Sequence, residues 1–300
     1  MKNNKLYIIA ALLGVALGGC EKEELYSPND NPEARTWKLV VQATKDVDSK
    51  ALAVSGNNLD AYWELEETVN VFYNGDVIGD LAVTAVSQEG NVDVATLSGR
   101  ISIPDGLSEG SKLYLLFPGR DDEEWNYLNQ DGLTSTIASQ FDYASAELTV
   151  ASLDSVNEVV EIQTGRASFT NEQSVYRLAF KIGDDATAVE SIMLTANENK
   201  LVRNRTFDEG AWQSNYGALH MDPTTAPAGN LYFMSIRNEN TSDSNNYIFT
   251  AVDRNNDVLY EGIKVINRNL INGKFYNATV NIDKKDLVSS GTISNASEVL

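Results

Sequence analysis

The apolar residues of this 300-residue chain alternate with polar residues over short stretches, and helical periodicity is nearly absent. A repeat of two places apolar side chains on one face of an extended strand, so each stretch predicts a half-buried β-strand. The apolar face of the first stretch carries Trp37, Leu39, Val41 and Ala43. Gly75-Asp76 and Asp105-Gly106 are typical of the turns that join such strands. The alternation therefore predicts an all-β protein.

Comparable stretches occur in both halves of the chain. In the first half they cover residues 37–44, 69–73, 81–86, 92–97, 101–103 and 112–117. In the second half they cover residues 176–182, 191–195, 231–236, 247–252, 258–266 and 275–282. Two sets of short strands predict two β-sandwiches in tandem, which we place at 36–172 and 173–300. The polar stretch 119–142 is predicted to be a long loop of the first sandwich.

The N-terminus has the features of a cleavable signal peptide. Lys2 and Lys5 flank the start of an apolar stretch at 6–17, which is too short to span a bilayer of roughly 30 Å. The chain then reads Leu17-Gly18-Gly19-Cys20, which resembles the lipobox of bacterial lipoproteins. We therefore expect residues 1–19 to be removed and Cys20, the only cysteine, to carry a lipid. Two or more acyl chains would anchor the protein stably.

Residues 20–35 are polar and acidic and contain two prolines. Such a composition cannot bury enough apolar area to become ordered, so we expect a flexible tether that bears the lipid. The acidic residues after the cysteine also resemble the export signal of surface-exposed bacterial lipoproteins. This resemblance implies a lipid anchor in the outer membrane with the protein facing outward. A solvated linker explains the same residues equally well.

The formal net charge of −20 becomes −22 when the signal takes away Lys2 and Lys5. Nucleic-acid phosphates and anionic lipid surfaces would both be repelled, and no basic stripe offsets this charge. We therefore expect no nucleic-acid partner, and contact with the membrane only through the lipid. The acidity itself is typical of an exposed, soluble surface.

Residues suited to catalysis or metal binding are scarce. His220 is the only histidine, and no free cysteine remains, which nearly excludes thiol proteases, Ser-His-acid triads and histidine-rich metal sites. The adjacent acids at 121–124 are interpreted as a solvated loop. The acidic run at 253–257 lacks the glycine of a calcium loop and is interpreted as a hairpin turn. The sequence therefore predicts no enzyme, no cofactor and no metal.

Aromatic residues leave a second function open. A sugar-stacking platform could be formed by Tyr62, Trp63, Trp125, Tyr127, Trp212 and Tyr216. Packing in the core or anchoring of loops is the more common use of such side chains. The alternative to the function implied below is therefore a surface glycan-binding lipoprotein.

The order of several segments carries a resemblance to a known family. The first strand is followed by Lys50-Ala51-Leu52, by a Gly-Asn segment with a tryptophan at 56–63, and by a strand with an aromatic end at 66–73. Near the other end, residues 272–282 contain a Gly-Lys-Phe-Tyr strand. Together with the lipobox, this order resembles the fimbrillin family of type V pilins over nearly the whole chain. The sequence around Ser155 also resembles the O-glycosylation acceptor of the same bacteria.

The resemblance implies a lipoprotein of two transthyretin-like β-sandwiches that serves as a structural subunit of a cell-surface fimbria. In that family a surface protease cuts after a basic residue beyond the first strand. A strand of the next subunit then fills the groove, because the vacated groove exposes apolar surface and unpaired backbone groups. The implied partners are other fimbrial subunits and a host or bacterial surface ligand.

Carried onto this chain, the cut falls between Lys50 and Ala51, and the removable strand is residues 37–44 at the edge of the first sandwich. The family commonly has arginine at the cut, whereas a cut after Arg35 would release the lipid and leave the groove filled. The tail at 283–300 is too sparse in apolar residues for a regular donor strand. Two roles stay open: a stalk subunit, slightly favoured, and an anchor or accessory subunit that keeps its first strand. A central position for that strand would count against the fimbrial interpretation as a whole and favour a lipid-tethered, β-rich envelope protein.

Overall fold

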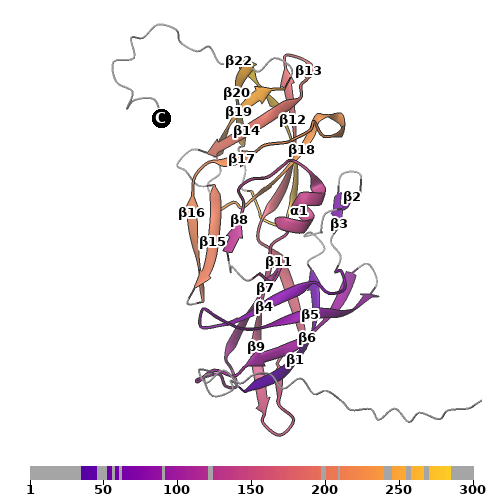
Figure 1. Cartoon of the computed structure of the whole chain (residues 1–300), viewed down its shortest axis with the longest axis vertical. Helices are drawn as coiled ribbons and strands as arrows, with labels where there is room; N and C mark the ends of the chain where they lie inside the picture. Colours follow the sequence, from indigo (N-terminus) through magenta and orange to yellow (C-terminus); the bar gives the residue numbers. More distant parts are fainter. Residues whose placement is uncertain are drawn as a thin grey trace, which may run out of the picture. The chain divides into compact units, whose positions relative to one another are not determined.

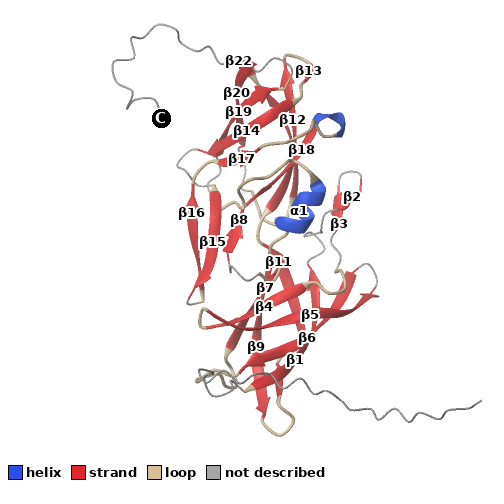
Figure 2. Cartoon of the chain, viewed as in Figure 1, coloured by secondary structure: helices blue, strands red, loops and turns tan. Residues whose placement is uncertain are grey.

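The computed structural model describes residues 35–45, 53–55, 58–60, 63–89, 92–120, 124–196, 201–208, 210–239, 245–254, 258–266 and 270–284. Strands dominate this part of the chain, and its single α-helix is α1 (Thr134–Gln140) (Figures 1 and 2). The prediction of an all-β protein is therefore confirmed for the described residues. The predicted signal peptide, the lipid site Cys20, most of the tether and the predicted cut at Lys50-Ala51 lie outside them.

Seven strands of the first half close into one barrel-like sheet. They are β1 (Thr36–Lys45), β4 (Thr68–Tyr73), β5 (Asp76–Glu89), β6 (Val92–Ser102), β7 (Lys112–Phe117), β9 (Ala144–Asp154) and β11 (Arg166–Asn171). The pairing runs β1-β6-β5-β4-β7-β9-β11 and returns to β1, and β10 (Val159–Ile162) pairs with both β9 and β1. A register shift between Val83 and Ala85 of β5 gives the long strands room to curve. One closed sheet therefore stands where the sequence predicted the two sheets of a sandwich.

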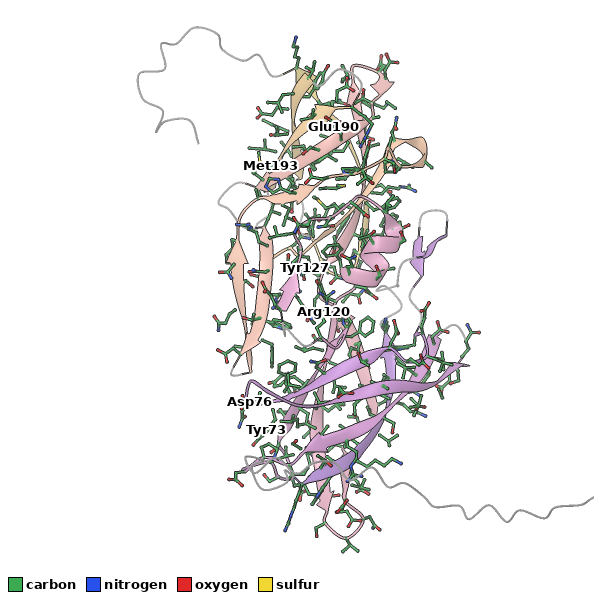
Figure 3. The ribbon with its side chains drawn as sticks, viewed as in Figure 1. Tyr73, Asp76, Arg120, Tyr127, Glu190 and Met193 are labelled. Carbon is green, nitrogen blue, oxygen red and sulfur yellow. The ribbon has the colours of Figure 1, made fainter. Side chains whose placement is uncertain are left out.

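The hairpin between β4 and β5 follows directly from its sequence. Tyr73 and Asp76, labelled in Figure 3, bracket the two turn residues Asn74 and Gly75. These two residues have φ angles of 53° and 96°, which glycine and asparagine tolerate better than other residues do. The turn predicted around Gly75 is confirmed, and β5 begins at Asp76.

Strand β1 is paired on both sides. It runs antiparallel to β6 from Thr36 opposite Ser102 to Thr44 opposite Val94. Its other side pairs in parallel with β10 at Lys38 and with β11 as far as Lys45. The prediction that this strand lies at the edge of a sheet is wrong. Its second side is paired with β10 and β11, which come more than a hundred residues later in the chain. Alternation within β1 carries no information about these neighbours.

The barrel encloses its own hydrophobic core, to which every strand of the ring contributes. Its fully buried members include Leu39, Val69, Leu81, Leu97, Leu113, Val150 and Phe169. Burying each such side chain stabilises the fold by about 1.5–3 kcal/mol relative to leaving it exposed. The period of two in the sequence thus corresponds to inward and outward positions of the barrel.

Two further sheets form most of the second half. One holds β12 (Ser174–Ile182), β13 (Asp185–Ala186), β18 (Leu231–Ile236) and β21 (Phe275–Asn281). The other holds β14 (Val189–Ala196), β17 (Leu219–Met221), β19 (Asn245–Asp253), β20 (Val258–Ile266) and β22 (Asp283–Lys284). Phe180 of the first sheet and Phe249 of the second are in edge contact, with ring centroids 5.8 Å apart. The two sheets therefore share a second core.

The β19–β20 pairing also bears on the acidic run that was weighed as a calcium loop. Asp253 lies opposite Val258 at the end of this antiparallel pair. The strands on either side of the run therefore pair with each other, and residues 255–257 themselves lie outside the described residues. A 3₁₀ turn at Ala228–Asn230 leads into β18 elsewhere in this half.

Residues 124–143 leave the barrel and complete the second core. β8 (Glu124–Asn126) pairs with β15 (Val202–Asp208), which in turn pairs with β16 (Ala211–Tyr216). Tyr127, labelled in Figure 3, is fully buried in the second core together with Ile137 of α1. The prediction of a long loop in the first sandwich is wrong, because these residues carry their own apolar side chains. A small hairpin, β2 (Ala53–Ser55) with β3 (Asn58–Asp60), completes the described strands.

Candidate functional site

The inward face of β1 fills a groove between β6 on one side and β10 and β11 on the other. We call this space the β1 groove. Trp37, Leu39, Val41 and Ala43 are buried in it, with exposed fractions of 7%, 0%, 1% and 0%. The intervening residues Lys38, Val40 and Gln42 are exposed on the outer face. All four residues predicted for the removable strand therefore contact the barrel core.

Hydrogen bonds beyond the ladder hold the first end of β1. Arg35, the less favoured cut site, is exposed, and its carbonyl accepts a hydrogen bond from the backbone N–H of Ile103. Arg100 of β6 donates to the backbone carbonyl of Thr36 and to the Glu158 carboxylate, the latter at 2.9 Å. These contacts begin at Arg35, the first residue that the structure describes.

The last residue of β1 brings a charge into the barrel. Lys45 is 6% exposed, and its Nζ lies 3.4 Å from the Asp142 carboxylate, which is itself buried. The same Nζ lies 3.7 Å from the ring centroid of Phe117 and 4.4 Å from that of Trp63. Trp63 in turn meets the rings of Phe117 and Phe169 edge-on at 5.3 Å. An ammonium between two aromatic faces and a carboxylate is a favourable arrangement for a buried cation.

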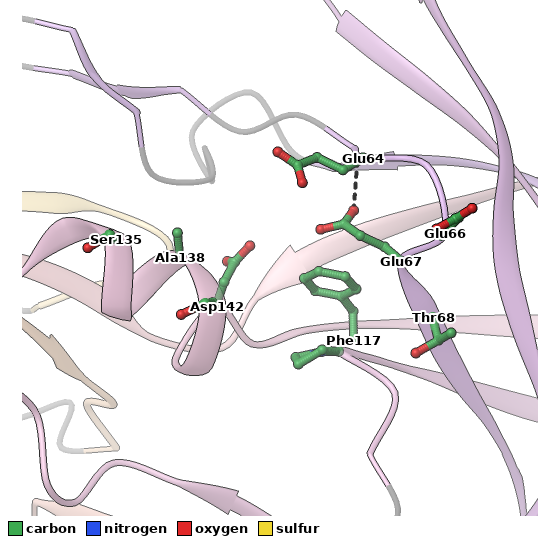
Figure 4. Close-up of a pocket in the computed structure, with 10 residues that line it drawn as sticks. Glu64, Glu66, Glu67, Thr68, Phe117, Ser135, Ala138 and Asp142 are labelled. Carbon is green, nitrogen blue, oxygen red and sulfur yellow. Dashed lines mark hydrogen bonds between the residues drawn. The ribbon is translucent and has the colours of Figure 1, made fainter.

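An acidic cavity of about 370 Å³ adjoins this charge. Figure 4 shows its lining, with Glu64, Glu66 and Glu67 near the start of β4 and Asp142 beyond α1. Glu67 accepts a hydrogen bond from the backbone N–H of Glu64 at 2.9 Å. Burial raises the pKa of Glu67, and the nearby Lys45 ammonium opposes that rise. Within the described residues no group of histidines, cysteines and acids is arranged to hold a metal ion.

Ser155 lies where a modifying enzyme could reach it, in the exposed turn between β9 and β10. Asp154 shapes this turn, because its carboxylate accepts hydrogen bonds from the side chain of Asn157 at 2.6 Å and from the backbone N–H of Val156 at 2.9 Å. These bonds lower the pKa of the Asp154 carboxyl group. The geometry leaves the Ser155 prediction untested but keeps its side chain accessible.

Three of the six aromatic side chains considered for sugar stacking, those of Trp63, Trp125 and Tyr127, are buried, whereas Trp212 is half-buried, Tyr216 is 48% exposed and Tyr62 lies outside the described residues. Trp63 and Trp125 are 3% and 2% exposed. Trp125 packs on the rings of Tyr143 and Trp212 at centroid distances of 4.9 and 4.3 Å, and the Arg205 guanidinium covers Trp212 at 3.8 Å. The interpretation as core packing is confirmed for Trp63, Trp125 and Trp212, because their rings contact other side chains of the protein. His220 is exposed on β17.

Sequence reasoning missed Lys45 and Asp142, which form the buried ion pair of the site. A signal for Lys45 was present, because the apolar series at 37, 39, 41 and 43 continues to position 45. A lysine there points inward with the rest of that face. Nothing comparable marked Asp142, which follows α1 at the end of a polar stretch.

No helix in the part of the chain described here is long and apolar enough to cross a bilayer. No protein-family model matches the sequence, and no curated protein matches it.

Solved structures provide the remaining comparisons. A structure described as that of a cell adhesion protein from Bacteroides ovatus has a TM-score of 0.43 at 14% identity, over 83% of this chain and 95% of the other. The tip fimbrial protein Mfa3 from Porphyromonas gingivalis, in a C-terminally truncated form, has a TM-score of 0.34 at 10% identity, over 80% and 85%. A structure described as that of polysaccharide binding proteins from Bacteroides thetaiotaomicron has a TM-score of 0.36 at 11% identity, over 82% and 90%.

Proposed function

We propose that this chain is a structural subunit of a cell-surface fimbria that keeps its first strand, in an anchor or accessory position. The order of the sequence segments supports the fimbrillin resemblance, and the pairing of β1 on both sides supports the role. It places the protein at the outer membrane, held by a lipid on Cys20, with other fimbrial subunits as its partners. The observation that carries the role is that β1 closes the barrel with a partner strand on each side.

The pairing of β1 on both sides favours a subunit that keeps this strand, unless another strand takes its place. Its loss would leave the facing edges of β6 and of β10 and β11 without backbone partners, and each unpaired buried group costs free energy. It would also expose the core that Trp37, Leu39 and Val41 cover, at about 1.5–3 kcal/mol for each large side chain. A cut between Lys50 and Ala51 breaks none of these contacts, so it would leave β1 bound.

The departures from the family pattern support the same role. A lysine stands at the predicted cut, and the C-terminal tail has too few apolar residues to act as a regular donor strand. Assembly by donor-strand exchange, the mechanism that the resemblance implies for a stalk, therefore lacks both a preferred cut and a suitable donor in this chain.

The experiment is to determine the N-terminus of the protein recovered from cells, together with its presence in purified fimbriae. We expect an acylated Cys20 at the start of an intact chain that still contains β1, associated with fimbriae at their membrane end. A chain that begins at Ala51 and forms SDS-resistant ladders would show a stalk subunit instead. Absence of the protein from fimbriae, with the intact chain elsewhere on the surface, would refute the fimbrial role itself.

A further inference from the structure

The charged end of β1 differs from the rest of its inward face. Four apolar side chains precede it at every second position, and the fifth inward position is Lys45. Its ammonium lies among Asp142, Phe117 and Trp63, which we call the lysine site. The lysine and its carboxylate partner are both more than nine-tenths buried.

The lysine site compensates charge that other elements place there. Asp142 follows α1, and Glu67 lies beside the start of β4, so neither acid belongs to β1. If the ammonium were absent, the buried Asp142 carboxylate would lose its opposite charge. Removing one partner of a buried ion pair is strongly destabilising, because it leaves an uncompensated charge. Removing both partners is far less costly.

We infer that the lysine site selects the strand that occupies the β1 groove: the groove requires an extended strand whose inward side chains are apolar at four alternate positions and end in a lysine ammonium. The occupant in this structure is the β1 of the chain itself. An apolar strand without the lysine does not meet this requirement. This inference rests on the proposed retention of β1. It explains that retention by the contact between Lys45 and Asp142.

Hydrogen exchange measured by mass spectrometry on the purified full chain tests this inference. Lys45→Met keeps the length of the side chain and removes its charge. We expect backbone amides of residues 37–45 to exchange roughly 100-fold faster in this variant, with β18 and β19 unchanged. The matched control is Lys38→Met, the same change on the exposed face of the same strand, which should leave β1 protection within about twofold of the original chain.

A second substitution in the groove makes the test specific. Lys45→Met combined with Asp142→Asn removes both charges, and we expect most of the lost protection of β1 to return. Lys45→Met alone could unfold the whole chain, in which case the amides of β19 would also exchange faster. The single variant Asp142→Asn then serves as the test of the inference. It should then speed exchange of β1 about tenfold and leave β19 protected.

Three results would overturn the inference: unchanged β1 protection in Lys45→Met or in the deciding Asp142→Asn variant, equal loss in Lys38→Met, or no recovery in the double variant. These measurements use purified protein, whereas the fimbrial role is tested on protein from cells. Failure of one therefore leaves the other standing.

Discussion

Replacing Leu39 with alanine tests whether β1 is an integral part of the barrel. Leu39 is fully buried, and its partner across the antiparallel ladder is Gly99 of β6. A methyl group added at Gly99 would lie 2.1 Å from the backbone carbonyl oxygen of Asp80, so β6 is already in close contact with β5 there. The neighbouring backbone therefore cannot move in to fill the space that Leu39→Ala would leave.

The size of the effect follows from this rigidity. Truncating a buried leucine costs about 2–5 kcal/mol, and the cost rises with the cavity that remains. Because a glycine and a fixed backbone line the space, we expect a loss in the upper part of this range, about 4 kcal/mol. Val40→Ala is the matched control, since Val40 is 44% exposed on the outer face of the same strand. We expect it to change stability by about 0.5 kcal/mol at most.

The assay is urea unfolding followed by far-ultraviolet circular dichroism and tryptophan fluorescence. Both signals should report the Leu39→Ala loss, because Trp37 and Trp63 belong to the same core. A difference below about 1 kcal/mol between Leu39→Ala and Val40→Ala would refute the reasoning, since β1 would then be loosely held.

Three other perturbations have outcomes set by the structure. Gln130→Met should destabilise by about 2–4 kcal/mol in urea, because the buried amide donates to the Ser235 carbonyl at 2.9 Å and accepts from its N–H at 2.7 Å. Gly99→Ala should cost about 1–3 kcal/mol and lower the melting temperature, because the new methyl would strike the Asp80 carbonyl. Burial raises the pKa of Tyr247 to about 12, so stability should fall as pH rises from about 10 to about 12, by on the order of 2–3 kcal/mol.

The sign of the alkaline effect follows from proton binding. Above the ordinary tyrosine pKa the unfolded chain releases the Tyr247 proton while the folded chain keeps it, so each increase in pH favours unfolding. Tyr247→Phe should remove part of this slope and leave the rest to Tyr176, whose pKa burial also raises. An unchanged slope in Tyr247→Phe would contradict the assignment.

Asn74→Gly and Lys112→Ala, both away from the substituted sites, serve as surface controls for Gln130→Met and Gly99→Ala.

Strands with strong alternation were predictable from the sequence, and closure of the sheet was not. The predicted ranges 231–236 and 258–266 agree with β18 and β20 to the residue, because both stretches are rich in apolar and aromatic residues between polar flanks. In contrast, 92–97 and 101–103 are parts of the one strand β6. Residues 98–100 separate the two predicted strands, whereas in the barrel they continue β6, and Gly99 permits close approach to β5.

Strand β15 escaped prediction because its buried positions are not all apolar. Arg205 is 2% exposed, and it is held by the Glu172 carboxylate at 3.0 Å and by the face of Trp212. A buried arginine looks like a solvent-facing residue in the sequence, since its partner lies 33 positions away. The same limit applied to Lys45, whose inward position broke the apolar pattern of β1 at its end.

Residues 124–143 have a consequence for the making of this protein. Their aromatic side chains, among them Trp125 and Tyr127, emerge from the ribosome well before β15, β18 and β19, against which they finally pack. Until those strands are synthesised, the segment has no complete surface to cover it. A fragment that begins at residue 173 would meet the converse difficulty, because it would lack this piece of its interior. The second half is therefore expected to reach its final state only together with residues 124–143, and residues 173–300 alone should not be recoverable as a soluble fragment.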